Sequence, residues 1–330
     1  MTGLLSRYAE AIYWLARYVE RSENTARVLD VNETFSRDSQ GGQNWASIVA
    51  LYADAEDFDE RYGEATAETV LRFYLLDDQH PGSILSAVRA ARENARTLRP
   101  LISTEMWVNL NTFFNRMRAL RDEDIAEERV ARLLAWIKES CQAHTGITEG
   151  TFYRDEGWYF YEMGRAIERA DQTTRLLDVK YHLLLPSVAA VGSPLDLSQW
   201  NAVLRSAAGY HAFRRIHPSG MTVARVADFL LFNRRFPRSV AACVDEVNER
   251  LTTLRSRYGL KGGSAALERL DEVRAVLDNE PVERVLAQGL HEFLDWIQLQ
   301  MSDVGWLIGR DFFGYQAAEP PVLTAAQSQG

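Results

Sequence analysis

The chain has 330 residues, long enough to bury a large hydrophobic core in one domain or two. Its hydrophobic fraction of 46% and charged fraction of 25% are ordinary for a globular protein, and its net charge of −9 argues against phosphate-neutralising binding to nucleic acid. Two cysteines exclude a disulfide framework. No apolar run reaches the length of a signal peptide or membrane span. We expect a cytoplasmic protein that binds neither nucleic acid nor membrane.

Helical periodicity runs through the chain, and no segment alternates as a strand would. In chain order we expect a helix over about 3–36, shorter helices within 45–77, and further helices over about 81–98, 103–120, 124–144, 154–184, 196–212, 221–234, 238–257, 264–278 and 282–310. Asp124 is expected to cap the helix that follows it. Loops are expected at 39–44 and 186–194, and a disordered tail over 316–330.

One segment of the sequence occurs twice. Residues 17–31 (RYVERSENTARVLDV) return 148 positions later as residues 165–179 (RAIERADQTTRLLDV), with eight of fifteen positions identical. Self-similarity of this kind indicates a duplicated structural unit. We therefore expect an all-α fold, an antiparallel helical bundle with internal duplication. Its pseudo-two-fold halves would cover about 1–150 and 151–315 of a single domain.

Each copy presents a narrow apolar stripe when it is drawn as a helix with 100° per residue. The stripe consists of Leu15, Val19, Ser22, Ala26 and Leu29 in the first copy and of Met163, Ile167, Ala170, Thr174 and Leu177 in the second. We expect both stripes to lie in the core. Their small residues would allow another helix to approach closely.

The opposite face of each copy is polar. It carries Tyr13, Arg17, Glu20, Arg21, Asn24 and Arg27 in the first copy and Tyr161, Arg165, Glu168, Arg169, Gln172 and Arg175 in the second. One interpretation is a solvent-exposed face with weak ion pairs. The other is a buried charged centre, favoured because arginine suits buried pairing and no lysine precedes Lys138. If a pseudo-two-fold axis relates the halves, both faces converge on one cleft, as a substrate site or as a structural ion-pair network.

Several motifs resemble those of the bacterial alpha-E family. Residues 5–27 resemble its opening motif and residues 154–171 its central motif, while 81–84, 91–96 and 232–239 also match its pattern. The resemblance covers residues 3 to about 315, and His80 departs from the asparagine that is more frequent there. It implies an all-helical protein encoded beside, or fused to, a circularly permuted ATP-grasp protein and often a transglutaminase-like peptidase. The implied chemistry is ATP-dependent amide or peptide bond formation on a small metabolite or peptide.

The motif residues and this resemblance together provide the site prediction. Glu20 and Glu168 are the candidate catalytic residues. The expected substrate-binding residues are Glu10, Arg17, Arg21, Asn24, Arg27, Arg165, Arg169 and Arg175. We expect no metal site, because no histidine lies three residues after a glutamate and no Cys/His cluster occurs. No cofactor is expected in this chain, and ATP with Mg²⁺ is expected on the partner.

Three functions remain open from the sequence. The first is a companion subunit of an ATP-grasp amidoligase that contributes a Glu/Arg-lined substrate site. The second is a stand-alone acyl- or aminoacyl-transfer enzyme with a motif glutamate as general base, and the third is a non-catalytic helical scaffold. A basic cluster of Arg234, Arg235 and Arg238 is interpreted either as cations at a helix C-terminus or as a surface for a phosphate or an acidic partner.

Overall fold

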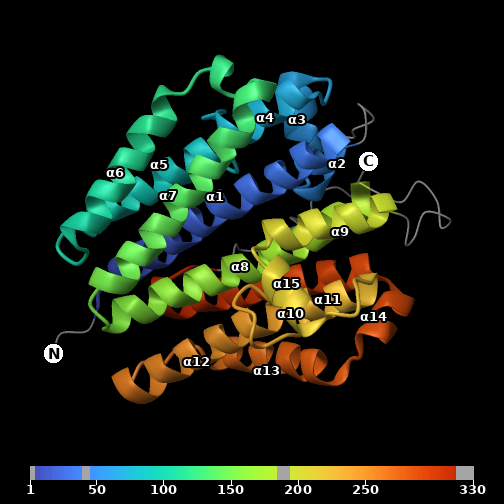
Figure 1. The fold of residues 1–330 in the computed structure, drawn as a ribbon. Helices are drawn as coiled ribbons and strands as arrows, with labels where there is room; N and C mark the ends of the chain where they lie inside the picture. Colours follow the sequence, from blue (N-terminus) through green and yellow to red (C-terminus); the bar gives the residue numbers. More distant parts are fainter. Residues whose placement is uncertain (1–3, 39–44, 184–193, 317–330) are drawn as a thin grey trace, which may run out of the picture.

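A computed structural model describes residues 4–38, 45–183 and 194–316 (Figure 1). Over these residues the chain is helical and contains no strand, so the all-α prediction is confirmed. No helix in the described part is long and apolar enough to cross a membrane. The expected loop at 39–44, nearly all of the expected connector 186–194, and the expected tail from residue 317 onward lie outside the described residues.

The helices of the first half follow in the order α1 (Ser6–Asp38), α2 (Ala46–Leu51), α3 (Ala55–Tyr62), α4 (Ala67–Leu75), α5 (Ile84–Thr97), α6 (Thr104–Ala119) and α7 (Glu127–Thr151). Those of the second half are α8 (Glu156–Leu183), α9 (Pro194–Ser206), α10 (Tyr210–Ile216), α11 (Val223–Leu231), α12 (Val240–Tyr258), α13 (Ser264–Asn279), α14 (Val282–Gln288) and α15 (Leu290–Ile308). A 3₁₀ turn, η1 (Asp122–Asp124), precedes α7, and a π-helix, η3 (Gly309–Phe313), follows α15.

The two repeat helices, α1 and α8, lie side by side at the centre of the molecule (Figure 1). They run in the same direction, because Leu4 N donates to Glu156 Oε2 at 3.0 Å near their starts, while Arg169 contacts Glu20 further along. Both predicted apolar stripes are buried, which confirms that interpretation. A Cβ at Gly164 would lie 2.4 Å from the carbonyl oxygen of Tyr13, so the helices approach at a distance that only glycine allows.

Each central helix has the same kind of neighbours. Helix α1 packs against α5 and α7, and α6 contacts both; helix α8 packs against α12 and α15, and α13 contacts both. The two groups lie on opposite sides of the central pair in Figure 1. This is the arrangement that an internal duplication predicts, and the duplication itself stays a prediction.

Four helix boundaries differ clearly from the sequence prediction. Helix α7 continues to Thr151 instead of ending at about residue 144. Asp124 does not cap α7; its side chain accepts a hydrogen bond from Arg121 N at 2.9 Å within η1. The helix expected over 196–212 is divided at Ala208, whose φ is 55°. The helix expected over 282–310 is divided at Gly289, whose φ of 126° is incompatible with a continuing helix. In the last two cases the apolar periodicity of the sequence continues across the break, so the sequence pattern alone predicts one continuous helix.

Candidate functional site

The two repeat helices exchange ion pairs across their contact. Arg169 of α8 donates to both carboxylate oxygens of Glu20 on α1, at 2.9 and 2.7 Å. In the opposite direction, Arg21 of α1 donates to both oxygens of Glu168 on α8, at 2.6 and 3.0 Å. Arg17 adds a third hydrogen bond to Glu168, from Nε at 2.8 Å. Two-point pairing between guanidinium and carboxylate is the strong, orienting form of this interaction.

The turn before α12 contributes a further arginine. Arg238 donates to Glu20 Oε1 at 3.0 Å, to Asn24 Oδ1 at 3.2 Å and to Glu23 Oε1 at 2.5 Å. Its side chain is only 13% exposed. Neither sequence interpretation of the basic cluster therefore holds for Arg238, which lies inside the molecule as a partner of the first repeat helix.

Both glutamates of the exchange are buried and stay ionised. Glu20 is 2% exposed and Glu168 is 1% exposed, so the interpretation as a solvent-exposed face is wrong and that of a buried charged centre is confirmed. Burial alone would raise the pKa of Glu168, but the charges of Arg21 and Arg17 outweigh it and lower the pKa to about 2. The pKa of Glu20 is likewise lowered, since Arg169 and Arg238 outweigh its burial.

This pairing limits what the two glutamates can do. A carboxylate whose pKa lies far below neutrality is a weak base, and its oxygens here already accept from arginines. A general-base role for Glu20 or Glu168 stays a prediction, and it requires a substrate that displaces an arginine. The network is suited to hold charges of both signs in fixed positions.

Two of the predicted arginines extend the network toward the neighbouring half. Arg27 pairs with Glu23 at 2.6 Å and donates to the carbonyl oxygen of Ser206 at the end of α9. Arg175 pairs with Asp171 at 2.9 Å and donates to the carbonyl oxygen of Leu51 at the end of α2, also at 2.9 Å. Equivalent repeat positions therefore make equivalent contacts.

Two other predicted residues lie away from the exchange. Glu10 accepts a hydrogen bond from the hydroxyl of Tyr315 at 2.9 Å, next to η3. Arg165 pairs with Glu162 at 2.6 Å and lies 3.3 Å from Glu246 of α12. Six of the predicted residues therefore lie together at the contact of the central helices: Arg17, Glu20, Arg21, Asn24, Glu168 and Arg169. Glu10 and Arg165 lie outside this group.

A pocket of about 320 Å³ opens beside Glu168. It is lined by side chains of α1, α8 and the first-half segments between α2 and α5: Arg21, Thr25, Tyr52, Asp54, Asp57, Tyr74, His80, Pro81, Gly82, Glu168, Asp171, Gln172 and Arg175. We call it the first-half pocket. A second pocket, of about 440 Å³, shares Arg21, Asp171 and Arg175 with it and extends along Arg17 to α15.

His80 is the unusual side chain of the first-half pocket. Its ring is 4% exposed and stacks on Phe73, with centroids 3.9 Å apart and planes inclined by 20°. Neither ring nitrogen makes a hydrogen bond, although carboxylate oxygens of Asp54 and Asp57 lie 3.5 Å away. Burial lowers the pKa of His80, which keeps the ring neutral, and raises that of Asp54, which accepts from the Tyr74 hydroxyl at 2.9 Å.

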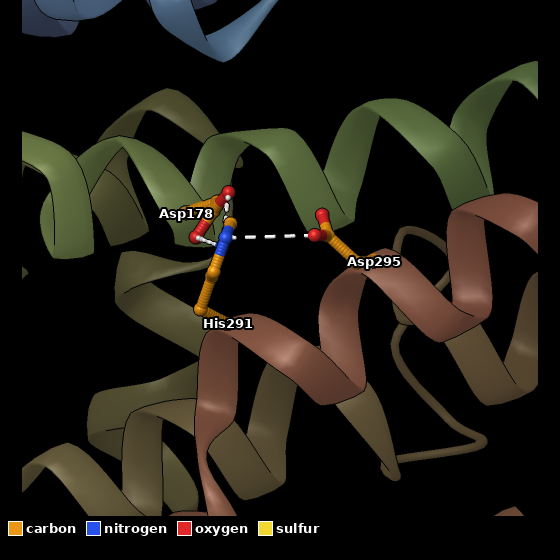
Figure 2. Close-up of side chains that lie close together, drawn as sticks. All are labelled: Asp178, His291 and Asp295. Carbon is orange, nitrogen blue, oxygen red and sulfur yellow. Dashed lines mark hydrogen bonds and ion pairs between the residues drawn. The ribbon is translucent and has the colours of Figure 1, made fainter.

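A separate cluster joins α8 to α15. Figure 2 shows His291 between Asp178 and Asp295, with Nδ1 3.0 Å from Asp178 Oδ1 and Nε2 3.5 Å from Asp295 Oδ2. One ligand atom of each residue lies within 4.8 Å of the others, so the group has the composition of a metal site. The Glu-x-x-His and Cys/His spacings do not include this arrangement, because Asp178 and His291 are 113 residues apart; the expectation of no metal site stays a prediction.

The electrostatics of this cluster favour an ion pair. Burial lowers the pKa of His291, but the hydrogen bond and charge of Asp178 outweigh it and the net shift is upward. Protons and metal ions compete for the same ring nitrogen atoms, so a raised pKa favours the ion pair over metal binding. The corresponding aspartate of the first repeat, Asp30, forms a 2.8 Å ion pair with Lys138 of α7. The same position thus links each central helix to a neighbour.

Comparison with known proteins gives a family match over nearly the whole chain. Residues 4–313 match the Alpha-E family model, described as a predicted alpha-helical domain with a conserved ER motif. The chain is 25% identical to an uncharacterized protein of Mycobacterium bovis and to two of Mycobacterium tuberculosis. Each match covers 90% of this chain and 36% of the relative, so the chain spans little more than a third of these relatives' length. No solved structure matches the chain.

Proposed function

Because the chain belongs to the Alpha-E family, we propose that it is the helical companion of a circularly permuted ATP-grasp amidoligase and contributes a substrate site. The first-half pocket carries the proposal. Its volume of about 320 Å³ suits a small metabolite or the end of a peptide, and its walls hold carboxylates and guanidiniums in fixed places. The two Glu-Arg dipeptides of the repeat, Glu20-Arg21 and Glu168-Arg169, fix the wall of this pocket: Arg21 and Glu168 line it, and the exchanged ion pairs hold both central helices in place.

The proposal divides the chemistry between two proteins. The partner binds ATP and Mg²⁺ and activates a carboxylate, while this chain holds and orients one of the two reactants for amide or peptide bond formation. The described residues contain no strand with which to build an α/β nucleotide-binding frame. The longer relatives support the division, because the matched region fills only 36% of their length and leaves room for further domains. We place the complex in the cytoplasm, with a transglutaminase-like protein as a further partner.

Co-expression with a circularly permuted ATP-grasp protein from the same genome tests the proposal. We expect the two to co-purify, and we expect ADP release in the presence of candidate carboxylates and amines to be faster with this chain than without it. Asp54→Asn, in the pocket, should reduce the stimulation, whereas Asp59→Asn, on the exposed side of α3, should not. The proposal is wrong if no complex forms and ADP release is the same with and without this chain.

The same experiment separates a companion from a scaffold. Under the scaffold interpretation, pocket variants would leave ATP turnover per folded complex unchanged. A stand-alone enzyme would instead turn over its substrate without the partner. The depressed pKa of Glu168 gives no support to a stand-alone enzyme that uses this residue as its general base.

A further inference from the structure

The first-half pocket has a structural counterpart in the second half. Segments 66–84 and 222–240 align without a gap, and six of their nineteen residues are identical. This identity is too low to be conclusive by itself, so we compare the local structures of the two segments. Ser83 caps α5 and Ser239 caps α12, each accepting from the backbone N–H three residues on. Each serine hydroxyl also donates to the carbonyl oxygen six residues earlier. The two turns are therefore built alike.

The rings within these turns also correspond. His80 stacks on Phe73 in the first half, with centroids 3.9 Å apart and an angle of 20°. Phe236 stacks on Phe229 in the second half, at 4.5 Å and 28°. One aromatic position is thus a hydrocarbon ring in one half and an imidazole in the other.

The residue two places after each ring differs in a decisive way. In the second half it is Arg238, whose guanidinium lies among Glu20, Glu23 and Asn24. In the first half it is Gly82, and a Cβ there would lie 2.5 Å from His80 Nε2. In the second half this turn thus places a cation on the central helix, and the corresponding turn of the first half has no side chain that could do so; Glu168 receives its second arginine from Arg17 on α1 instead.

The helix facing Gly82 keeps the acceptors of the filled site. At the offset of the helical repeat, the residues that receive Arg238 correspond to Glu168, Asp171 and Gln172, and all three line the first-half pocket. Together the pocket walls carry four carboxylates (Asp54, Asp57, Glu168, Asp171) and two guanidiniums (Arg21, Arg175). Glu168 is already paired with Arg17 and Arg21, Asp171 with Arg175, and Asp57 with Arg61. Asp54 is the one of the four for which the described residues provide no arginine partner, and it accepts from the Tyr74 hydroxyl.

The remaining walls are polar in the first half and apolar in the second. A second correspondence, set by the left-handed Ala53 (φ 58°) and Ala208 (φ 55°), pairs residues 52 and 54 with 207 and 209. The first-half pocket is walled by Tyr52, Asp54, Tyr74 and His80, where the second half has Ala207, Gly209, Leu230 and Phe236. His80 brings two buried ring nitrogens without hydrogen bonds into this wall. Buried polar atoms of this kind require a partner, and a ligand group in the pocket supplies one.

We propose that the first-half pocket binds the guanidinium end of a small molecule, in the place that Arg238 occupies in the second half. The inference deepens the proposed function and rests on it, because it names the substrate class of the same pocket: a guanidine on an aliphatic stem, of which arginine and agmatine are the simplest examples. The planar fork of such a group matches fixed carboxylate acceptors, which a compact ammonium group does not.

Direct binding to the isolated chain tests this inference without the ATP-grasp partner. By calorimetry or by NMR titration we expect arginine or agmatine to bind, and citrulline, whose neutral ureido group has nearly the same shape, to bind at least about tenfold more weakly. Putrescine, an ammonium of similar reach, should also bind more weakly than agmatine. Equal binding of arginine and citrulline, which differ only in the guanidinium or ureido end, overturns the proposal, and so does the absence of binding by both arginine and agmatine. If putrescine binds more strongly than agmatine, the pocket selects an ammonium group and the proposed guanidine class is wrong.

Two variants make the test specific. The double change His80→Phe with Gly82→Arg copies the second half into the first, so it should keep the melting temperature and abolish agmatine binding. Asp54→Asn should weaken agmatine binding about tenfold in a folded protein, whereas Asp59→Asn should have no effect. Unchanged affinity in Asp54→Asn counts against the proposal even if the double variant does not fold. Agmatine binding without a partner complex would refute the proposed function alone, and stimulated ADP release without agmatine binding would refute this inference alone.

Discussion

Arg169 on α8 holds both carboxylate oxygens of Glu20 on α1, while Arg21 on α1 holds both oxygens of Glu168 on α8. Each Glu-Arg dipeptide is therefore completed by the other copy. A charge removed from one helix leaves its partner buried and unpaired on the other, and this makes the two halves energetically dependent on each other.

The first prediction concerns Arg238. Arg238→Gln should lower the free energy of unfolding by about 3 kcal/mol, because it leaves Glu20 and Glu23 with fewer donors in a buried setting. Urea unfolding followed by circular dichroism measures this. Arg235→Gln, three residues earlier on the exposed surface, is the matched control and should change stability by no more than about 0.5 kcal/mol. Equal effects of the two changes would show that the buried pairing contributes nothing.

The second prediction concerns acid stability. The pKa of Glu168 is lowered from 4.5 to about 2 in the folded protein, so its contribution is fully present above pH 4.5 and is lost as the pH falls toward 2. Melting temperatures measured between pH 6 and pH 2 should therefore fall more steeply for the wild type than for Glu168→Gln. Glu128→Gln, on the exposed face of α7, should follow the wild type. Parallel curves for all three proteins would contradict the assignment.

The third prediction concerns His291, whose pKa is raised in the fold by Asp178. A group of this kind stabilises the folded state fully below its ordinary pKa of 6.5, and the contribution is lost as the pH rises through the raised value. Melting temperature should fall over this interval in the wild type and much less in His291→Gln. EDTA should leave the melting temperature unchanged. A Zn²⁺-dependent increase that His291→Gln abolishes would instead make the cluster of Figure 2 a metal site.

The fourth prediction concerns the contact of the central helices. Gly164→Ala should destabilise the protein by about 2 kcal/mol or more, because the added methyl would lie 2.4 Å from a backbone oxygen of α1. Gly146→Ala, in the interior of α7 with nothing within 4 Å of the new methyl, is the control and should stabilise by up to about 1 kcal/mol. Thermal or urea unfolding of the two variants tests the comparison. A harmless Gly164→Ala would mean that the helices can separate locally.

The centre of the fold was accessible from the sequence because its signals are local. Spacing along one helix placed Leu15 and Leu29 in the core, and the choice of arginine over lysine indicated that the polar face is buried. Arg238 could not be predicted in the same way, since it reaches Glu20 from 218 residues away through the geometry of a turn. The break at Gly289 was missed because glycine in an apolar pattern does not reveal a positive φ.

The pocket was missed for a related reason. Asp54 and His80 lie in short connections that are rich in polar residues, and only the packing of those connections on α8 makes these two side chains walls of one cavity. The departure from the family pattern at His80 was visible in the sequence, but its meaning required the stacked ring and its unbonded nitrogens.

The missing side chain at position 82 gives a criterion that applies beyond this chain. A relative with a long basic residue at that position would supply its own cation to α8 and would have no vacancy for a guest molecule. In an alignment of Alpha-E sequences, the residue at this one position would then separate two groups. In one group the pocket would be open to a guanidine, and in the other a side chain of the protein itself would fill the site in both halves.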